Sequence, residues 1–426
     1  VLHSQMQARN LRASAVGCCT FWHNVLGVGG DVTPVTPVLH PFDTRAAAAA
    51  AELGRRVDGA AQHSRTGCVL HASYLPAKLL WLSTANPQAF NSARQWMSFG
   101  EFLYLRLFGR SMASTSMVSG SGLWDQNRND YDDEILSVLP INRAQLAPPG
   151  EMDQPLRSLK LEFSSLWPGF DGIPWFPAWG DGACSNIGCD CHSPDRFALM
   201  VGTSGALRAV SETENMKIPA NLWCYRVDRG RFILGGALSN GGEVYAWMKR
   251  VLALPDDEEI EKQLHAMKPG SHGLTILPLF AGERSPNWRA EARAVIAGLS
   301  AGTQPIEILQ GALESVALRF RLLYGLMTAH FGSPREVIAS GGALLRSPAW
   351  TQMIAGALAR PVTACLESEG SSRGVALLAL ERLGAIAHAR DLPGRMGKVF
   401  EPIPADRIVY EEQFERQGQL YARIFG

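Results

Sequence analysis

The stretch Ala198-Leu199-Met200-Val201-Gly202-Thr203-Ser204-Gly205 joins a short apolar run to a turn that contains two glycines. A short apolar run bounded by turn residues is typical of a buried strand. Two further apolar runs also end in glycines: 231–234 leads into 235–242, and 336–340 leads into Gly341-Gly342-Ala343. Glycines let the backbone approach a ligand, and exposed N–H groups at turns bind phosphate. One such turn is usually only a tight turn, but three in one region favour a nucleotide site.

Length and charge describe a large globular chain. Because 426 residues exceed one ordinary core, we predict two domains, residues 1–197 and 198–426. Hydrophobic residues make up 46% and charged residues 19%, which argues against a disordered or fibrous chain. Lys and Arg together number 40, as do Asp and Glu, so the net charge gives no reason to expect nucleic acid or an anionic membrane as the main partner.

The sequence predicts a cytoplasmic protein. No apolar run approaches the roughly 18–20 residues that span a bilayer, and the first residues lack the pattern of a signal peptide. Eight cysteines are too sparse for a disulfide scaffold in a chain of this length.

The first third of the chain alternates apolar runs with helical patterns. Residues 15–21 are predicted to form a buried strand, and 25–28 is predicted to pair with 36–39 as a hairpin around Gly29-Gly30-Asp31. The alanine run 46–51 predicts a helix, with Thr44 as its N-cap.

Farther along, two helices and a second α/β unit are expected. Residues 77–108 predict two helices broken near Asn86-Pro87, and 140–180 predicts an irregular segment that leads into a cleft. Strands at 198–201, 231–234 and 336–340, with a helix from about Ala349, are expected in the second domain.

The common nucleotide motifs are absent. The chain has no Gly-x-x-x-x-Gly-Lys-Ser/Thr sequence, and no Gly-x-Gly-x-x-Gly follows its first strand, so neither a P-loop nor a Rossmann dehydrogenase is supported. A kinase without these motifs must hold the phosphates with hairpin turns on two facing domains.

Asp181 stands in the loop Ala178-Trp179-Gly180-Asp181-Gly182-Ala183. A lone Asp among small residues is usually a turn former. It could also act as a base for a hydroxyl that attacks a phosphoryl group, which requires a carboxylate within hydrogen-bond reach. Local composition leaves both interpretations open.

Seven segments, taken together and in order, resemble the FGGY family of carbohydrate kinases across nearly the whole chain. They are Tyr74-Leu75-Pro76-Ala77-Lys78-Leu79-Leu80-Trp81-Leu82, the Gly180-Asp181 loop, Gly202-Thr203-Ser204-Gly205, Ala281-Gly282-Glu283-Arg284-Ser285-Pro286, residues 298–317, Gly341-Gly342, and Glu369-Gly370-Ser371-Ser372-Arg373-Gly374-Val375-Ala376. Within this family the sequence is most similar to bacterial gluconate kinases. The residues that carry this likeness are Thr20-Phe21-Trp22-His23-Asn24, Phe42-Asp43-Thr44-Arg45, and residues 235–242 with Trp247.

The resemblance implies an α/β, two-domain actin/hexokinase-like (ribonuclease H-like) fold with a cleft between the domains. The first domain would bind the sugar and the second ATP. Asp181 matches the general base, which would take the proton from the 6-hydroxyl of gluconate; it could also contact Mg²⁺ through Mg-ATP. Trp22 and His23 would line the sugar pocket. The implied nucleotide-binding residues are Gly202, Thr203, Ser204, Gly205, Gly242, Gly341, Gly342 and Arg346. The family commonly dimerises, which makes a homodimer an expectation.

Other roles stay open at this stage. His23 could be a hydrogen-bonded, half-buried histidine, although the resemblance favours a sugar contact. Lys78 and Trp81 are expected to hold a helix against the cleft, and Glu283 and Arg284 to form a buried ion pair.

The family normally opens with a β-hairpin that carries an Asp-x-Gly-Thr-type loop, which contacts the phosphates and helps bind the metal. Nothing before Ala15 resembles it. We expect that an N-terminal piece precedes the given sequence, because an uncovered strand edge at 15–21 would favour aggregation. The chain as given is therefore expected to have little or no kinase activity.

Three alternatives accompany this interpretation. Cys184, Cys189, Cys191 and His192 could bind structural zinc, but they lack Cys-x-x-Cys spacing, and small buried cysteines are the simpler explanation. The substrate could be xylulose or another polyol. The chain could also be a non-catalytic homologue that binds sugar or nucleotide.

Overall fold

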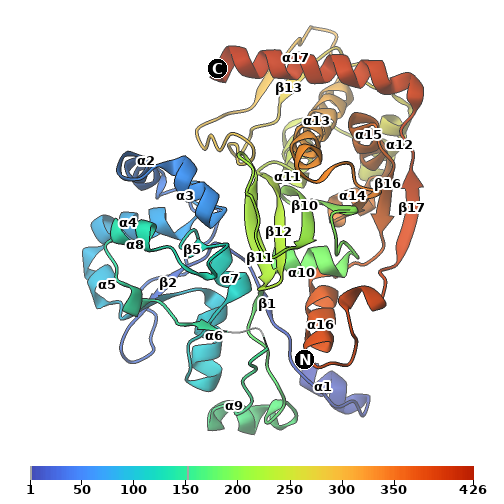
Figure 1. The fold of residues 1–426 in the computed structure, drawn as a ribbon. Helices are drawn as coiled ribbons and strands as arrows, with labels where there is room; N and C mark the ends of the chain where they lie inside the picture. Colours follow the sequence, from blue (N-terminus) through green and yellow to red (C-terminus); the bar gives the residue numbers. More distant parts are fainter. Residues whose placement is uncertain (1, 151–152) are drawn as a thin grey trace. The chain divides into compact units, whose positions relative to one another are not determined.

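The computed structural model describes residues 2–150 and 153–426, and its contacts divide the chain into two compact units (Figure 1). Unit 1 comprises the residues up to His192 together with Val210–Ile233 and Glu369–Pro393. Unit 2 comprises Ser193–Ala209, Leu234–Ser368 and Gly394–Gly426. The chain passes between the units within strands β10 and β12, and each unit is described by itself below.

Unit 1 is built from short helices and short strands. Its helices are α1 (Leu2–Ala8), α2 (Ala47–Arg56), α3 (Gly59–Thr66), α4 (Leu75–Ala85), α5 (Pro87–Ser92), α6 (Phe99–Phe108), α7 (Thr115–Ser119), α8 (Asp133–Ser137), α9 (Leu161–Leu166), α10 (Asp181–Gly188) and α16 (Gly370–Arg382). Its strands are β1 (Cys19–Thr20), β2 (Leu26–Val28), β3 (Gln95–Met97), β4 (Ala113–Ser114), β5 (Trp124–Asp125), β6 (Asp130–Tyr131), β7 (Pro149–Gly150), β8 (Trp179–Gly180) and β11 (Trp223–Asp228).

Unit 2 carries longer elements. Its strands are β9 (Arg196–Val201), β10 (Gly205–Glu212), β12 (Arg231–Leu238), β13 (Thr275–Leu277), β14 (Val295–Ala297), β15 (Glu336–Ser340), β16 (Val362–Cys365) and β17 (Met396–Phe400). Its helices are α11 (Gly242–Val251), α12 (Asp257–Ala266), α13 (Pro305–Phe331), α14 (Gly342–Arg346), α15 (Pro348–Leu358) and α17 (Arg407–Phe425).

A seven-stranded sheet in the order β11-β12-β10-β9-β15-β16-β17 provides the framework of unit 2, and its first strand, β11, belongs to unit 1. β9 and β10 pair antiparallel with Val201 opposite Gly205, so residues 202–204 make a tight connection. β15 runs parallel to both β9 and β16, which places Ser340 beside Met200. The carboxyl ends of β9 and β15, and the glycines that follow them, therefore lie at the same edge of the sheet. The predicted strands at 198–201, 231–234 and 336–340 are confirmed, as is the helix predicted from about Ala349, which begins at Pro348 as α15.

One predicted turn is shorter than expected. Gly235 and Gly236 lie inside β12, so the turn after this strand starts only at Ser239. Glycine is needed within the strand because a β-carbon at Gly235 would overlap the Leu207 carbonyl, and one at Gly236 would overlap the Leu323 side chain.

The early predictions for unit 1 hold in part. The hairpin of 25–28 with 36–39 is confirmed by paired backbone hydrogen bonds between Val25 and Leu39. The alanine helix is confirmed as α2, but Thr44 is not its N-cap: Ala46 is, because the Thr44 carbonyl closes a turn onto the Ala47 N–H. The strand predicted at 15–21 is reduced to β1 and a bridge from Val16 to Trp175, because its partner β8 ends where α10 begins.

The prediction of two helices over 77–108 was too simple. The break at Asn86-Pro87 is confirmed, since Asn86 caps α5 by accepting a hydrogen bond from the Ala89 N–H (3.2 Å). The second helix is in fact two, α5 and α6, separated by β3. A new helix starts there because Ser98 and Glu101 form a reciprocal capping box at the start of α6.

Helix α16, late in the sequence, packs closely against α10 in unit 1 (Figure 1). Glycines permit this approach: a β-carbon at Gly374 would overlap the Cys184 carbonyl, and one at Gly188 would overlap the Gly370 carbonyl. The helix that begins with Asp181 is therefore fixed by residues far along the chain. For example, the Ser371 hydroxyl donates a hydrogen bond to the Asp181 carbonyl (3.4 Å), 190 positions earlier in the sequence.

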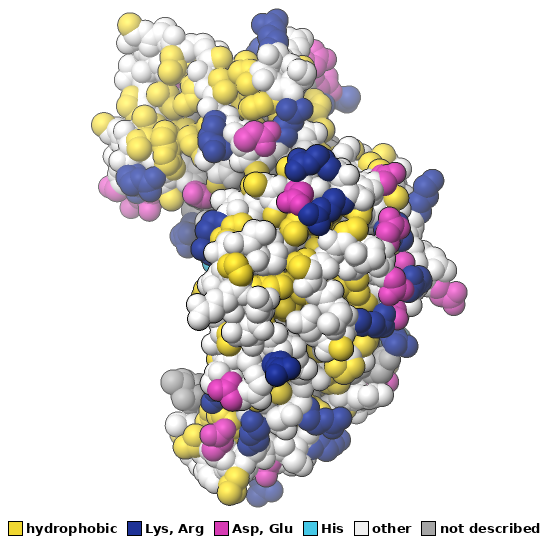
Figure 2. Space-filling view, turned by 90° about the vertical axis from the view of Figure 1, so that its left-hand side faces the viewer, with side chains coloured by type: hydrophobic (Ala, Val, Ile, Leu, Met, Phe, Trp, Pro, Cys, Tyr) yellow, Lys and Arg dark blue, Asp and Glu magenta, His cyan; other side chains and the backbone are white. Residues whose placement is uncertain are grey.

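Two surface properties complete the description. Within the described residues, no helix has both the length and the apolar character needed to cross a bilayer. On the face shown in Figure 2, Lys and Arg side chains lie among Asp and Glu side chains rather than in a stripe of one charge.

Candidate active site

Asp181 is the first residue of α10 and directly follows β8. Its side chain is exposed, and its Oδ1 accepts a hydrogen bond from the Gly182 N–H (2.8 Å). A helix N-terminus stabilises the ionised form of a carboxylate. Asp181 thus presents an accessible carboxylate on a helix whose position is fixed by α16.

Trp22 lies next to this loop because β1 and β8 run parallel, with Thr20 opposite Gly180. The indole is 6% exposed, and its Nε1–H donates to the Ser116 carbonyl (2.8 Å). A β-carbon at Gly180 would overlap this ring, and one at Gly120 would lie 2.9 Å from its Cδ1. The two glycines therefore leave the space that Trp22 fills, and they bring it beside Asp181.

His23 follows Trp22 and has a left-handed backbone, with φ of 60°. Its Nδ1 lies 2.5 Å from the Gly120 carbonyl oxygen. Because a carbonyl can only accept, Nδ1 carries a proton. The ring packs edge-on against Tyr74 and Tyr225, at centroid distances of 5.0 and 5.2 Å.

Tyr74 and Tyr225 complete an aromatic cluster that sequence reasoning missed. Their hydroxyls lie 2.6 Å apart, and Tyr225 also contacts Trp22 and stacks on Trp223. We define Trp22, His23, Tyr74 and Tyr225 as the aromatic cluster of unit 1. Tyr74 is the first residue of the segment 74–82 quoted in the sequence analysis and could have been found there. Tyr225 sits in an ordinary strand pattern and carries no local signal.

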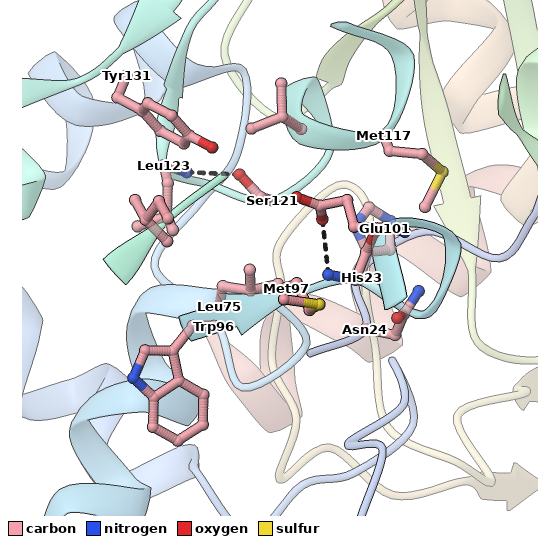
Figure 3. A pocket seen from close by; sticks show the side chains of 13 residues that line it. His23, Asn24, Leu75, Trp96, Met97, Glu101, Met117, Ser121, Leu123 and Tyr131 are labelled. Atoms are coloured by element: carbon pink, nitrogen blue, oxygen red, sulfur yellow. Dashed lines mark hydrogen bonds between the residues drawn. The ribbon is translucent and has the colours of Figure 1, made fainter. Parts of the chain in front are cut away.

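A small cavity of about 20 Å³ lies beneath His23 and Asn24 (Figure 3). Glu101 faces it, and its Oε2 accepts a hydrogen bond from the Ser98 N–H (2.6 Å). Burial raises the pKa of this carboxyl. The volume suits one water molecule rather than a sugar.

Lys78 and Glu283 are both buried charged residues for which the sequence predicted a role. Lys78 is 1% exposed on α4, and Trp81 on the same helix stacks under the Arg45 guanidinium at 4.5 Å. The predicted Glu283–Arg284 ion pair is wrong. Glu283 pairs with Arg319, which reaches it from α13, while Arg284 donates to the Leu238 carbonyl (3.2 Å).

Unit 2 contains a large pocket of about 1070 Å³, at the edge of the sheet where β9 and β15 end. Ligand sites commonly measure about 300–1,000 Å³, so this pocket is ample for a nucleotide. The predicted nucleotide residues that line it are Gly202, Thr203, Gly242, Gly342 and Arg346. Ser204, Gly205 and Gly341 are not among its lining residues; Gly341, with φ of 97°, instead makes the turn out of β15.

The turn after β9 and the start of α11 are joined by hydrogen bonds. The Gly242 N–H donates to the Gly202 carbonyl (2.8 Å), and the Glu243 N–H donates to the Thr203 carbonyl (3.0 Å). These bonds fix two glycine-bearing segments from different parts of the sequence as one floor of the pocket.

Helix α12 supplies a wall that sequence reasoning missed. Its residues in the pocket are Asp257, Glu258, Glu261, Lys262 and His265. Glu261 is fixed there, because its carboxylate accepts hydrogen bonds from the Ser347 hydroxyl (2.7 Å) and the Ala349 N–H (2.6 Å). An exposed, charged helix surface carries no local signal that would distinguish a pocket wall from a solvated face.

The cysteines of the zinc alternative are buried in unit 1. Cys184, Cys189 and Cys191 are each at most 2% exposed, and burial raises the pKa of the Cys184 thiol well above its usual value. The Nε2 of His192 lies 3.1 Å from the Oδ1 of Asp190. Across residues 2–150 and 153–426, no group of three His, Cys, Asp or Glu side chains is arranged to hold a metal ion.

An exposed carboxylate beside an aromatic cluster, and a nucleotide-sized pocket floored by glycine turns, are the parts expected of a phosphotransferase for small polar molecules. Two family models match the chain: the N-terminal domain of the FGGY family of carbohydrate kinases over residues 2–188, and its C-terminal domain over 197–381. The chain belongs to this family of phosphotransferases and has its two-domain α/β fold.

Known relatives differ in their named substrates. The chain is 24% identical to a gluconokinase of Bacillus subtilis, over 93% of this chain and 79% of that one. It is 27% identical to a xylulose kinase of Streptomyces rubiginosus, over 95% and 81%. A ligand-bound xylulose kinase from Lactobacillus acidophilus superposes with a TM-score of 0.92 at 25% identity, covering 100% of this chain and 87% of that one.

Proposed function

We propose that this kinase phosphorylates a sugar acid, D-gluconate, at its 6-hydroxyl with ATP, to give 6-phosphogluconate and ADP. The observation that carries the proposal is the exposed Asp181 carboxylate, fixed beside the aromatic cluster of unit 1. The gluconokinase similarity and the segments at 20–24 and 42–45 support gluconate as the substrate.

In the proposed mechanism, Asp181 accepts the proton of the attacking hydroxyl. The hydroxyl oxygen then forms a bond to the γ-phosphorus, the bond from that phosphorus to the bridging oxygen of ADP breaks, and the proton passes from Asp181 to solvent. Trp22 and His23 would orient the sugar, so that the hydroxyl meets the carboxylate within hydrogen-bond distance. We assign the sugar to residues 1–197 and the nucleotide to 198–426.

The phosphate end of ATP is assigned to Gly202 and Thr203. Gly242 and Gly342 would lie along the nucleotide, with Arg346 near the adenosine. Mg²⁺ suits this chemistry because it needs only one or two carboxylates besides phosphate oxygens and water. The exposed Asp181 carboxylate could provide such a contact, and Mg²⁺ bound with ATP would neutralise charge on the phosphates.

The experiment is a coupled ADP-release assay of the full-length protein with D-gluconate, D-xylulose and glycerol. Preferred turnover of gluconate supports the proposal. Preferred turnover of xylulose would overturn the substrate assignment in favour of the second candidate, which the xylulose kinase similarity supports. Stabilisation by sugar and ATP in a thermal-shift assay, without turnover of any substrate, would instead indicate a binding protein.

A further inference from the structure

The backbone of His23 needs an explanation. A non-glycine residue with φ of 60° is uncommon and costs about 1 kcal/mol or more, so it persists only where its surroundings hold it. The side chain is held by the Gly120 carbonyl, as described above. The remaining question is what holds the peptide carbonyl that this backbone conformation turns inward.

Lys78 makes that contact. Its Nζ donates to the His23 carbonyl (2.5 Å) and to the His40 carbonyl (3.0 Å). One buried side chain on α4 thus joins two loops, which carry the segments Thr20-Phe21-Trp22-His23-Asn24 and Phe42-Asp43-Thr44-Arg45. Asn24 secures the next residue, since its Oδ1 accepts a hydrogen bond from the Phe99 N–H (2.6 Å).

Lys78 can hold both carbonyls whether or not its amine is protonated. Both of its partners are neutral carbonyls, and burial lowers its pKa to about 7, opposed by the carboxylate of Asp43. Asp43 is itself paired with Arg45, whose guanidinium donates three hydrogen bonds to the carboxylate, of 2.9, 3.2 and 2.6 Å. A neutral amine still has two N–H donors, enough for two carbonyls.

We propose that Lys78 is a positioning residue for the sugar: it holds the left-handed turn at His23 and thereby fixes the imidazole and the neighbouring Trp22 in place. This inference rests on the proposed role of Trp22 and His23 in binding the sugar. A purely structural lysine would affect the binding of both substrates, whereas this role predicts that loss of the Lys78 amine weakens the binding of the sugar and leaves the binding of ATP unchanged.

The test is Lys78→Met, which keeps the length and apolar stem but removes both donors. Leaving a buried carbonyl without a donor costs enough to raise the KM for the sugar about tenfold, whereas the KM for ATP should stay unchanged. Lys78→Arg, which retains donors, should recover part of the loss. Lys217→Met, at an exposed lysine of unit 1, is the matched control and should behave as the parent protein.

A second readout is independent of turnover. In protein labelled with ¹⁵N-histidine, the hydrogen-bonded Nδ1–H of His23 should give a slowly exchanging signal, assigned by its loss in His23→Gln. We expect that signal to disappear or exchange faster in Lys78→Met. An unchanged signal and an unchanged sugar KM in folded Lys78→Met would overturn the inference.

The two proposals fail in different ways. If the full-length protein phosphorylates no sugar, the proposed function fails, while the imidazole signal still tests whether Lys78 holds His23. If Lys78→Met does not fold, the same two measurements are made on Lys78→Arg. Because arginine displaces the pair of donors, the KM for the sugar should rise and the imidazole signal of His23 should exchange faster, each by less than in a full loss of the donors. Equal changes in the KM for sugar and for ATP would indicate general damage and would also contradict a positioning role.

Discussion

The pocket of unit 2 and the aromatic cluster of unit 1 are built in different ways. The pocket is open, about 1070 Å³ in volume, and its floor is made of backbone at Gly202, Thr203 and Gly242. The cluster is packed, and its nearest cavity measures about 20 Å³. The floor of one region is main chain, whereas the other region presents rings and a carboxylate.

This difference indicates where specificity resides. A triphosphate can be bound by N–H groups and glycines that almost any side chain could accompany. A sugar must be distinguished from other polyols by a few side chains in fixed positions. Related kinases with different named substrates can therefore share the fold and the pocket while differing at residues near Trp22 and His23.

The largest effect is expected from Asp181→Asn, a substitution that should impair catalysis at the aromatic cluster of unit 1 without affecting nucleotide binding in the pocket of unit 2. Amide replacement keeps the shape but removes the base, so kcat should fall about 10³-fold. ADP affinity, measured by titration calorimetry, should be unchanged. A variant that retains most of the parent kcat would show that Asp181 is not the base.

Gly374→Ala tests whether unit 1 depends on close helix packing. Its β-carbon would overlap the Cys184 carbonyl, so we expect destabilisation by about 3 kcal/mol in urea unfolding and loss of turnover. Gly418→Ala on α17 is the control, because no atom lies within 4 Å of the added carbon. That change should stabilise the helix by about 0.5–1 kcal/mol. Equal outcomes for the two substitutions would contradict the packing argument.

The buried amine of Lys78 predicts a pH dependence of the stability of unit 1. Its pKa is about 7 in the fold and 10.5 for the free side chain, so the unfolded chain binds more protons between these values. The contribution of this group to the free energy of unfolding should therefore rise with pH above 7, by about 2 kcal/mol up to pH 9. Urea unfolding at both pH values should show this gain in the parent protein but not in Lys78→Met. A gain of the same size in both proteins would exclude Lys78 as its source.

The smallest effect is expected from Arg346→Ala. Arg346 lines the pocket, and its guanidinium folds back toward Gly342, with Nη1 3.2 Å from where a β-carbon would stand. Losing the proposed contact between Arg346 and the adenosine should weaken ADP binding about five- to tenfold, or about 1 kcal/mol, while the KM for the sugar stays constant. A shift in the sugar KM instead would break the proposed division of labour.

The residues that form the floor of the pocket could be predicted from the sequence better than those that form its walls. Glycine after an apolar strand is a local signal, so the edge where β9 and β15 end could be predicted from the residues themselves. The wall on α12 and the contribution of Tyr225 depend on tertiary packing, which brings ordinary charged or strand residues to a site. The same limit explains the wrong partner for Glu283, since Arg319 reaches it from α13 rather than from the neighbouring position.

Some predictions remain as they were made. Asp181 became a candidate base through the order of seven segments, not through its own loop, and its role awaits the substitution above. The domain boundary near residue 197, the cytoplasmic location and the homodimer also stay predictions.

The indole of Trp22, enclosed between Gly120 and Gly180, has a consequence for altering what the protein accepts. These three positions form one steric unit: any side chain added at 120 or 180 must be matched by a smaller ring at 22. Libraries that vary position 22 alone should open voids, and those that vary either glycine alone should yield mostly unfolded chains. Productive variants should therefore appear as coordinated changes at all three positions, and natural homologues should show the same covariation.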